Sequence, residues 1–401
     1  MRSTFYWVFV GLLTLSSEMA LCQDANNKGG VDAESSKTLK IVQNIERDSL
    51  KGVVGISTSS DGRFLYASAY TSAAIHAFSI DQQTGKLTLI EDIIDRAKLR
   101  GVTDFCLSPD GKTGVASAFA SKAATLFQRE TESGKLTMLH SVDANTSGLK
   151  SIQFPIRAAF SMDGRFVYVA DSGISRSFFS ASRPSVIVLK IVNQQLEFVE
   201  SFASEEGILA DVRGIAVHPN DKHLFVVSSA GRCLVSFRRD LETGKLELAT
   251  VVRNGANDID VLDGAMSVAT DRSGKFIYTL AGRFRGRGAI GVFSFSAENS
   301  GLSLLEGHHS GSRGLEQFQG GNQLALSLDG QRLYAVGTAS GTLSILQRDV
   351  RTGILTPIET VAFRPKWKTS VAGVSVSPDN RFVYVSGGEL DTSITVLEVL
   401  P

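Results

Sequence analysis

The stretch Ser161-Met162-Asp163-Gly164-Arg165-Phe166-Val167-Tyr168 decides the fold, because the same pattern recurs along the whole chain. Its Asp-Gly pair favours a tight turn, and the alternating apolar residues that follow favour a β-strand. The equivalent turns stand at positions 61, 110, 163, 220, 273, 329 and 379. A period of about 50 residues is typical of the blades of a β-propeller.

A second turn recurs out of phase with the first, as in Thr84-Gly85-Lys86 and Thr243-Gly244-Lys245, and a short alternating strand follows it. Each repeat therefore contains four predicted strands, named a to d from the centre of the ring outward. The a–b turn is the Asp-Gly turn and the c–d turn is the Thr-Gly turn. The pattern predicts an all-β, seven-bladed β-propeller with four-stranded antiparallel blades.

The seventh repeat ends at strand c, Ile394–Val399, and lacks a strand d. Residues 38–43 show the apolar alternation of the other d strands, so we expect them to complete the last blade and close the ring. Closure of this kind leaves only short, protected sheet edges. The single propeller domain is predicted over residues 37–401, and the polar residues 23–36 are predicted to form a flexible leader.

The N-terminus has the form of an export signal. Phe5–Leu15 is an apolar stretch after a positively charged start, and Ala20-Leu21-Cys22 resembles a cleavage site. The sequence therefore predicts a signal peptide at residues 1–22 and a secreted protein, extracellular or periplasmic. An uncleaved anchor is the alternative, although the apolar run is shorter than the ~20 residues that a membrane-spanning helix needs. No membrane span is expected after cleavage.

Composition excludes some classes of function. Among 401 residues, 41 are Lys or Arg and 41 are Asp or Glu, so the formal net charge is zero. A neutral, exported chain is not expected to bind nucleic acid. The sequence contains no P-loop, serine-hydrolase elbow or zinc-ligand spacing, so we expect no cofactor and no metal. Cys106 and Cys233 are predicted to be free thiols, and the protein is expected to be a monomer.

The tight a–b and c–d turns fall on one face of the predicted disc, and the long b–c and d–a loops fall on the other. Function commonly lies on loops that a rigid scaffold holds, so the site is expected on the long-loop face, at the mouth of the central channel. Aligned starts of the a strands place there Gly55, Asp104, Arg157, Gly214, Ser267, Gln323 and Gly373, preceded by residues that include Arg213 and Asn322.

The polar members of this row, namely Asp104, Arg157, Arg213, Ser267, Asn322 and Gln323, would suit a small anionic or hydroxylated ligand. The alternative is that they bond to one another or to ordered water in the channel. In one b–c loop, Arg283 and Arg285 alternate with Phe284 and could contact a ligand or dock a protein partner. The alternative there is a solvated loop.

A further signature is the segment Phe237-Arg238-Arg239-Asp240 through Leu246, which follows a Ser-x-Asp-Gly-Arg-Phe-Val-Tyr-Val repeat. In both features the chain resembles the lactonase-type seven-bladed propellers over about residues 38–400. That family includes a bacterial 6-phosphogluconolactonase and the fungal carboxymuconate cycloisomerases. The resemblance implies the propeller fold and the possibility of lactone chemistry.

The chain departs from the family where chemistry is expected. Within Phe154–Phe160, Arg157 stands at the position of a histidine, and Ser172 replaces an acidic residue. A general base is missing from both places. The first hypothesis is therefore a propeller that binds a small ligand or a protein. The alternative is a lactone hydrolase in which Arg157 or Arg213 stabilises the oxyanion and Asp104 or Asp171 is the base.

Overall fold

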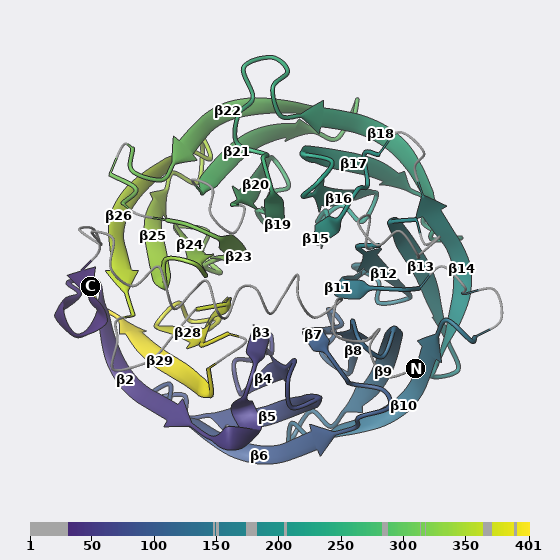
Figure 1. Cartoon of the computed structure of the whole chain (residues 1–401), viewed down its shortest axis with the longest axis horizontal. Coiled ribbons are helices and arrows are strands. Elements are labelled where there is room, and N and C mark those ends of the chain that lie inside the picture. Colours follow the sequence, from purple (N-terminus) through teal and green to yellow (C-terminus); the bar gives the residue numbers. More distant parts are fainter. Residues whose placement is uncertain are drawn as a thin grey trace, which may run out of the picture.

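The chain folds into seven sheets that stand side by side around one axis (Figure 1). The computed structural model describes residues 31–146, 149, 152–173, 183–203, 207–282, 288–312, 314–316, 318–363, 371–388 and 391–401. Within these residues the helical elements are two 3₁₀ helices, Ala33–Ser35 and Asp48–Leu50. No helix in the described ranges is long and apolar enough to span a membrane. The prediction of an all-β, seven-bladed propeller is confirmed.

From the innermost strand outward, the blades are β3 (Val53–Thr58), β4 (Phe64–Ala69), β5 (Ala74–Ile80) and β6 (Leu87–Ile94); β7 (Val102–Leu107), β8 (Thr113–Ala118), β9 (Ala123–Arg129) and β10 (Leu136–Asp143); β11 (Pro155–Phe160), β12 (Phe166–Asp171), β13 (Ser185–Val192) and β14 (Gln195–Ala203); β15 (Val212–Val217), β16 (His223–Ser228), β17 (Cys233–Arg239) and β18 (Leu246–Arg253); β19 (Ala265–Thr270), β20 (Phe276–Ala281), β21 (Ala289–Ser296) and β22 (Gly301–His309); β23 (Gly321–Leu326), β24 (Arg332–Gly337), β25 (Thr342–Arg348) and β26 (Leu355–Ala362); and β27 (Gly373–Val376), β28 (Phe382–Ser386), β29 (Ser393–Val399) and β2 (Leu39–Glu46). They are numbered blades 1 to 7 in this order.

The ring closes as the sequence predicts, because the outer strand of blade 7 comes from the N-terminal part of the chain. Strand β2 pairs antiparallel with β29, with Leu39 opposite Val399 and Glu46 opposite Ser393. The strand is three residues longer at its C-terminal end than the predicted 38–43. The first and last elements of the ring therefore lie side by side (Figure 1).

The end of the expected leader has a defined place in the structure. Strand β1 (Val31–Asp32) pairs in parallel with the end of β26 as a fifth strand of blade 6, and the 3₁₀ helix Ala33–Ser35 follows it. Glu359 of β26 accepts a hydrogen bond from Ser36 Oγ at 2.7 Å, which fixes the chain just before β2. Part of the segment that the sequence analysis assigned to the leader therefore lies against the outer edge of blade 6, which offers it backbone partners.

The core lies between the blades. The second strand of each blade is buried on both faces by its neighbours, as in β12, where all six residues are buried. This explains why the Phe-x-Tyr part of the repeat is so regular, since Phe166 and Tyr168 pack with Val226 and Phe237 of the next blade. Cys106 and Cys233 are free thiols, as expected.

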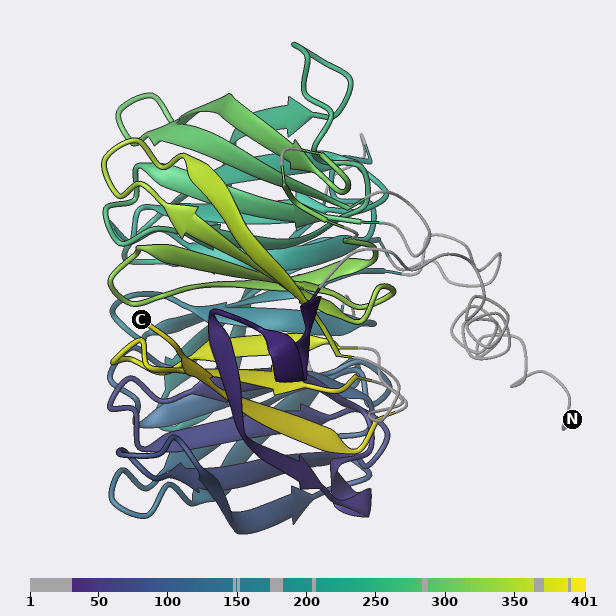
Figure 2. The same cartoon turned by 90° about the vertical axis from the view of Figure 1, so that its left-hand side faces the viewer.

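The Asp-Gly turns have the backbone geometry that their sequence indicates. Gly164 has φ +71°, a conformation that glycine adopts without strain. In the two repeats that lack this glycine, Asp221 and Asn380 adopt φ 60° and 61°, which Asp and Asn tolerate best among other residues. Figure 2 shows the disc edge-on, with the C-terminus at the face of these turns. We call it the short-turn face and the opposite one the long-loop face.

Candidate functional site

Six of the innermost strands carry a β-bulge at their first residues, near the end of the ring axis that lies on the long-loop face. In β11, Pro155 pairs with Asp171 and Arg157 pairs with Ala170, so Ile156 has no partner in the register. A bulge bends its strand and re-aims the side chains beside it. The residues skipped by the register are Val54, Thr103, Ile156, Arg213, Met266, and Asn322 with Gln323. The skipped positions include Arg213, Asn322 and Gln323, and in the other strands they directly precede the row of Asp104, Arg157 and Ser267 that the sequence alignment singled out.

Several predicted site residues join neighbouring blades through hydrogen bonds to the backbone. Asp104 Oδ2 accepts a hydrogen bond from the Ala158 N–H at 3.1 Å. The others are Ser267 Oγ accepting from Leu324 N–H at 3.4 Å, Gln323 Oε1 accepting from Val374 N–H at 3.3 Å, and Asn322 Nδ2 donating to the Ala372 carbonyl at 2.8 Å. These side chains thus have a structural role, whatever they do for a ligand.

At other positions of this row, glycine lets neighbouring blades approach closely because it has no side chain. Gly55 stands in the row of Asp104 and Arg157, and a Cβ there would lie 2.7 Å from the Thr103 carbonyl oxygen of the next blade. The inner strands approach too closely at this point for any side chain. The row therefore contains both positions that bond to the next blade and positions that pack closely against it.

Arg157 reaches across the ring. Its Nη2 lies 3.5 Å from the carbonyl oxygen of Asn322, which belongs to β23 on the opposite side of the axis (Figure 1). Its Nη1 lies 4.0 Å from Asp104 Oδ1, and 16% of the side chain is exposed. Burial lowers the pKa of Arg157, the Asp104 carboxylate opposes that change, and the Arg213 guanidinium adds to it. Arg157 is thus a mostly buried cation with only distant partners.

Asp104 and Arg213 complete what we call the axial cluster, defined as Asp104, Arg157, Arg213 and Asn322. Burial raises the pKa of Asp104, whereas Arg157 and the Ala158 N–H lower it. Arg213 Nε lies 2.7 Å from Asp211 Oδ1, and 31% of its side chain is exposed. The cluster places two guanidinium groups close enough near the axis for one to affect the pKa of the other.

Asp171 lies apart from this cluster, and its carboxylate is hydrogen-bonded to backbone N–H groups. Its carboxylate is buried and accepts hydrogen bonds from the N–H groups of Gln153, Phe154 and Gly173 at 2.6, 2.9 and 3.3 Å. Burial raises its pKa to about 6, although these hydrogen bonds oppose the shift. Asp171 therefore fixes the loop that enters β11, and its oxygens face backbone donors rather than a substrate.

Arg283 and Arg285 lie outside the described residues, so their place relative to the axial cluster is not assigned. Their loop joins β20 to β21 and therefore starts and ends on the long-loop face. Among the described residues, no group of three or more His, Cys, Asp or Glu side chains could hold a metal ion.

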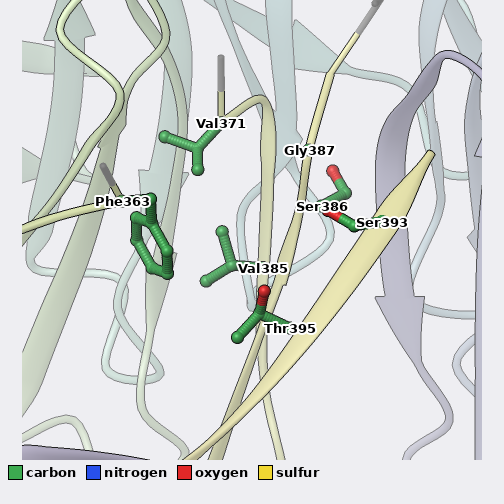
Figure 3. A pocket seen from close by; sticks show the side chains of 7 residues that line it. All are labelled: Phe363, Val371, Val385, Ser386, Gly387, Ser393 and Thr395. Carbon is green, nitrogen blue, oxygen red and sulfur yellow. The ribbon is translucent and has the colours of Figure 1, made fainter. Parts of the chain in front are cut away.

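A small pocket on the long-loop face was not predicted. It has a volume of about 10 Å³, which is space for about one water molecule, and lies at the edge of blade 7 (Figure 3). Its lining residues are Phe363, Val371, Val385, Ser386, Gly387, Ser393 and Thr395. Ser386 Oγ accepts the Gly373 N–H at 2.8 Å, and Thr395 Oγ1 donates to Asn44 Oδ1 at 3.1 Å.

Its walls come from different repeats and include no charged side chain, so the sequence offered no signal for it. Of the hydroxyl groups that line it, those of Ser386 and Thr395 also bond within the fold. The pocket is therefore poorly suited to an anion, and the axial cluster is the stronger candidate for function.

Comparison with known proteins agrees with this architecture. In sequence, none of the curated proteins compared with the chain matches it. A candidate 6-phosphogluconolactonase from Bacteroides uniformis has a TM-score of 0.61 and 18% identity, with 77% of this chain and 84% of that chain covered. A second candidate 6-phosphogluconolactonase, from Bacteroides fragilis, has a TM-score of 0.61 and 19% identity, with the same coverage.

Hydrazine synthase of Kuenenia stuttgartiensis has a TM-score of 0.64 and 16% identity, with 88% of this chain and 97% of that chain covered. At such identities these structures show the shared fold alone. The sequence model of the family described as "Lactonase, 7-bladed beta-propeller" matches residues 12–153, 156–262 and 320–401. Because that match spans most of the chain, this protein belongs to the lactonase family of seven-bladed β-propellers.

Proposed function

We propose that this protein is a binding propeller that holds a small anion, a carboxylate or a phosphate ester, at the axial cluster. The observation that carries the proposal is the state of Arg157. A guanidinium has five N–H donors, and the described partners of Arg157 are a carbonyl at 3.5 Å and a carboxylate at 4.0 Å. An anion on the axis would supply the short, charge-assisted hydrogen bonds that a mostly buried guanidinium favours.

The neighbouring charges support an anionic ligand. Arg213 adds a second guanidinium, and its repulsion contributes to the lowered pKa of Arg157. A bound anion would relieve that repulsion. Asp104 would limit the net positive charge of the cluster and orient Arg157, while its Oδ2 remains bonded to blade 3.

The proposal is tested by calorimetric titration of the protein with inorganic phosphate and with gluconate. We expect saturable binding that weakens at high salt, and Arg157→Ala to reduce affinity by about ten-fold or more. Arg272, an exposed arginine at the a–b turn of blade 5, provides the control, since Arg272→Ala on the short-turn face should leave binding unchanged. Absence of binding by the folded wild type, or equal binding by Arg157→Ala, would refute the proposal.

One observation favours lactone hydrolysis as a second candidate. Burial raises the pKa of Asp104, which makes its carboxylate a better base, and Arg157 is close enough to stabilise an oxyanion on the same ligand. The measurement is acid release from a panel of sugar and aliphatic lactones at fixed pH. Release that is lost in both Arg157→Ala and Asp104→Asn would favour the enzyme, whereas anion binding without release would favour the binding protein.

Asp104→Asn is a suitable variant, because an amide oxygen still accepts the Ala158 N–H while it can no longer take a proton. Asp171 is the less suitable base of the two predicted ones, since both its oxygens accept backbone hydrogen bonds. We expect Asp171→Asn to lower stability, not to alter a catalytic pH profile.

We further propose that the protein is exported after removal of residues 1–22, and that the long loops can dock a protein. The support is the N-terminal sequence and the alternation of Arg283, Phe284 and Arg285 in a long loop. N-terminal sequencing of the protein from the export compartment should begin at Gln23. A partner recovered equally well after replacement of Arg283, Arg285 and Arg287 together would exclude that loop.

A further inference from the structure

We call the contact between two neighbouring blades a seam. Three seams contain the same buried cluster of side chains. Between blades 1 and 2, Arg129, the last residue of β9, points back into blade 1. Its Nε donates to the Tyr66 hydroxyl at 2.9 Å, its Nη2 donates to Asp61 Oδ2 at 2.9 Å, and its guanidinium carbon lies 4.9 Å from the centre of the Phe64 ring. Its Nη1 donates to the Gly111 carbonyl at 2.8 Å.

The seams between blades 3 and 4 and between blades 5 and 6 repeat this arrangement. In each, the arginine is the last residue of the third strand, and it contacts a tyrosine, a turn aspartate and a phenylalanine of the preceding blade. The sets are Arg239 with Tyr168, Asp163 and Phe166, and Arg348 with Tyr278, Asp271 and Phe276.

The seam between blades 7 and 1 has every part of the cluster except the arginine. Tyr384, Asp379 and Phe382 stand at the tyrosine, aspartate and phenylalanine positions, but Ile80 ends β5. The equivalence is fixed by the backbone, since the Ile80 N–H bonds to the Arg63 carbonyl at 2.8 Å, just as the Arg129 N–H bonds to the Lys112 carbonyl at 2.8 Å.

The missing side chain leaves a pocket and an unpaired group. The pocket has a volume of about 260 Å³, opens to solvent on the short-turn face, and is lined by residues that include Gly62, Ile80, Gln82, Asp379 and Phe382. Beside it, the hydroxyl of Tyr384 is fully buried and has no hydrogen-bond partner among the described residues. In the three filled seams, the tyrosine hydroxyl accepts from the arginine.

We infer that this seam pocket binds an alkylguanidinium cation, the chemical group of an arginine side chain. The bound cation would donate to the Tyr384 hydroxyl and to the Asp379 carboxylate, and its plane would lie against the Phe382 ring. A fork of planar donors suits this geometry, whereas an ammonium group lacks the shape to stack and to bond at both places. The filled seams of the same molecule provide the template.

Two neighbours define how much of the site remains open. Gln82 Nε2 donates to the Gly62 carbonyl at 2.6 Å, and so takes the acceptor that corresponds to Gly111 in the filled seam. Arg381 Nη2 donates to the Gln83 carbonyl at 2.9 Å, and its Nη1 lies 3.9 Å from Asp379 Oδ2. It corresponds to Arg63, which occurs beside Arg129, so it does not replace the missing arginine.

This site is separate from the proposed anion site, because it lies at the rim of the opposite face and selects the opposite charge. The cation could be a free guanidine compound or an arginine on a partner chain. Both offer the same group, and they differ in what extends from the pocket.

The test is calorimetric titration with methylguanidinium, with urea as the neutral control of the same shape. We expect binding of methylguanidinium and none of urea. Ile80→Arg should fill the pocket from within, abolish binding of methylguanidinium and raise the melting temperature. A capped peptide, acetyl-Gly-Arg-Gly-amide, that binds about ten-fold more tightly than methylguanidinium would indicate a partner's arginine, whereas equal affinity would indicate a free compound.

Two matched variants separate binding from folding. Tyr384→Phe removes a hydroxyl without a partner, so it should weaken methylguanidinium binding and leave the melting temperature unchanged or higher. Tyr66→Phe should lower the melting temperature, because that hydroxyl also donates to the Gly134 carbonyl at 2.8 Å.

Arg129→Ile opens the same space in a filled seam and provides the positive control. Methylguanidinium should restore part of the stability that this variant loses. If it stabilises Arg129→Ile but neither binds nor stabilises the wild type, or if Ile80→Arg still binds it equally well, the inference is wrong.

Discussion

Asp61 and Asp163 are turn residues that bond both within their own turn and to the arginine of the neighbouring blade. Burial alone would raise the pKa of Asp61, but hydrogen bonds from Ser59, from the Arg63 N–H and from Arg129 lower it from 3.8 to about 2. The pKa of Asp163 also falls to about 2, for the same reasons. Each carboxylate thus joins its turn to the buried arginine of the next blade.

This pairing predicts how stability changes in acid. A carboxylate with a lowered folded pKa stabilises the fold fully above its unfolded pKa, and that contribution is lost as the pH falls from about 4 to about 2. Melting temperatures of the wild type and Asp61→Asn, measured from pH 6 to pH 2, should converge at the acidic end. A difference that stays constant over this range would show that the charge of Asp61 contributes nothing to stability.

At the scale of the element, the outer strands join neighbouring blades through a recurring hydrogen bond. Each has a β-bulge, and the residue after the skipped position turns toward the next blade. In β6 the register skips Ile90, and Glu91 Oε1 accepts the Leu136 N–H at 2.7 Å. The equivalent acceptors are Gln43 for Leu87, His140 for Leu196, Glu200 for Leu246, Glu306 for Leu355 and Glu359 for Thr38.

This repeated joint predicts a graded effect of substitution. Glu91→Ala should destabilise the protein by about 1–3 kcal/mol, because the partly buried Leu136 N–H loses its acceptor. Glu91→Gln should cost less, since Gln43 makes the same contact between blades 7 and 1. Urea unfolding with an unchanged m value measures both, and equal losses for the two variants would exclude the hydrogen bond as the cause.

The whole molecule depends on closure by β2. Removal of residues 1–46 would expose the edge of β29, and an unpaired edge strand recruits other chains. We expect this truncated protein to associate in size-exclusion chromatography with light scattering and to melt at a lower temperature. A synthetic peptide of residues 38–46 should restore the behaviour of the longer protein. A truncated protein that stays monomeric and equally stable would contradict a closing role for β2.

The sequence predicts the blades well because their signals are local. Each Asp-Gly turn and the alternating strand that follows it lie within a few residues of one another, and the outer strand that completes the last repeat shows the same local alternation at the other end of the sequence. The alignment of the repeats also singles out Asp104, Arg157 and Arg213, since Asp104 and Arg157 hold equivalent positions and Arg213 directly precedes that position in the next repeat. What the sequence did not show are contacts between repeats, such as Arg129 with Asp61, since these residues come together only when one blade packs on the next.

Asp171 illustrates the same limit. Its position beside a family motif suggested a catalytic base, but three backbone N–H groups from its surroundings occupy its carboxylate. The bulges that aim Arg157 and Arg213 also have no distinct residue type, so only the register reveals them. The pattern of residue types thus singled out candidate residues without revealing how the fold holds them.

The pairing of β2 with β29 also constrains how the protein is made. During synthesis β2 leaves the ribosome early, but its partner emerges more than 340 residues later. Until then the blade partners of β2 do not exist, and β2 is an unpaired strand that other nascent chains can capture. The ring can therefore be completed only after β29 has been synthesised, so the last strand to be made sets the earliest time at which the fold can close.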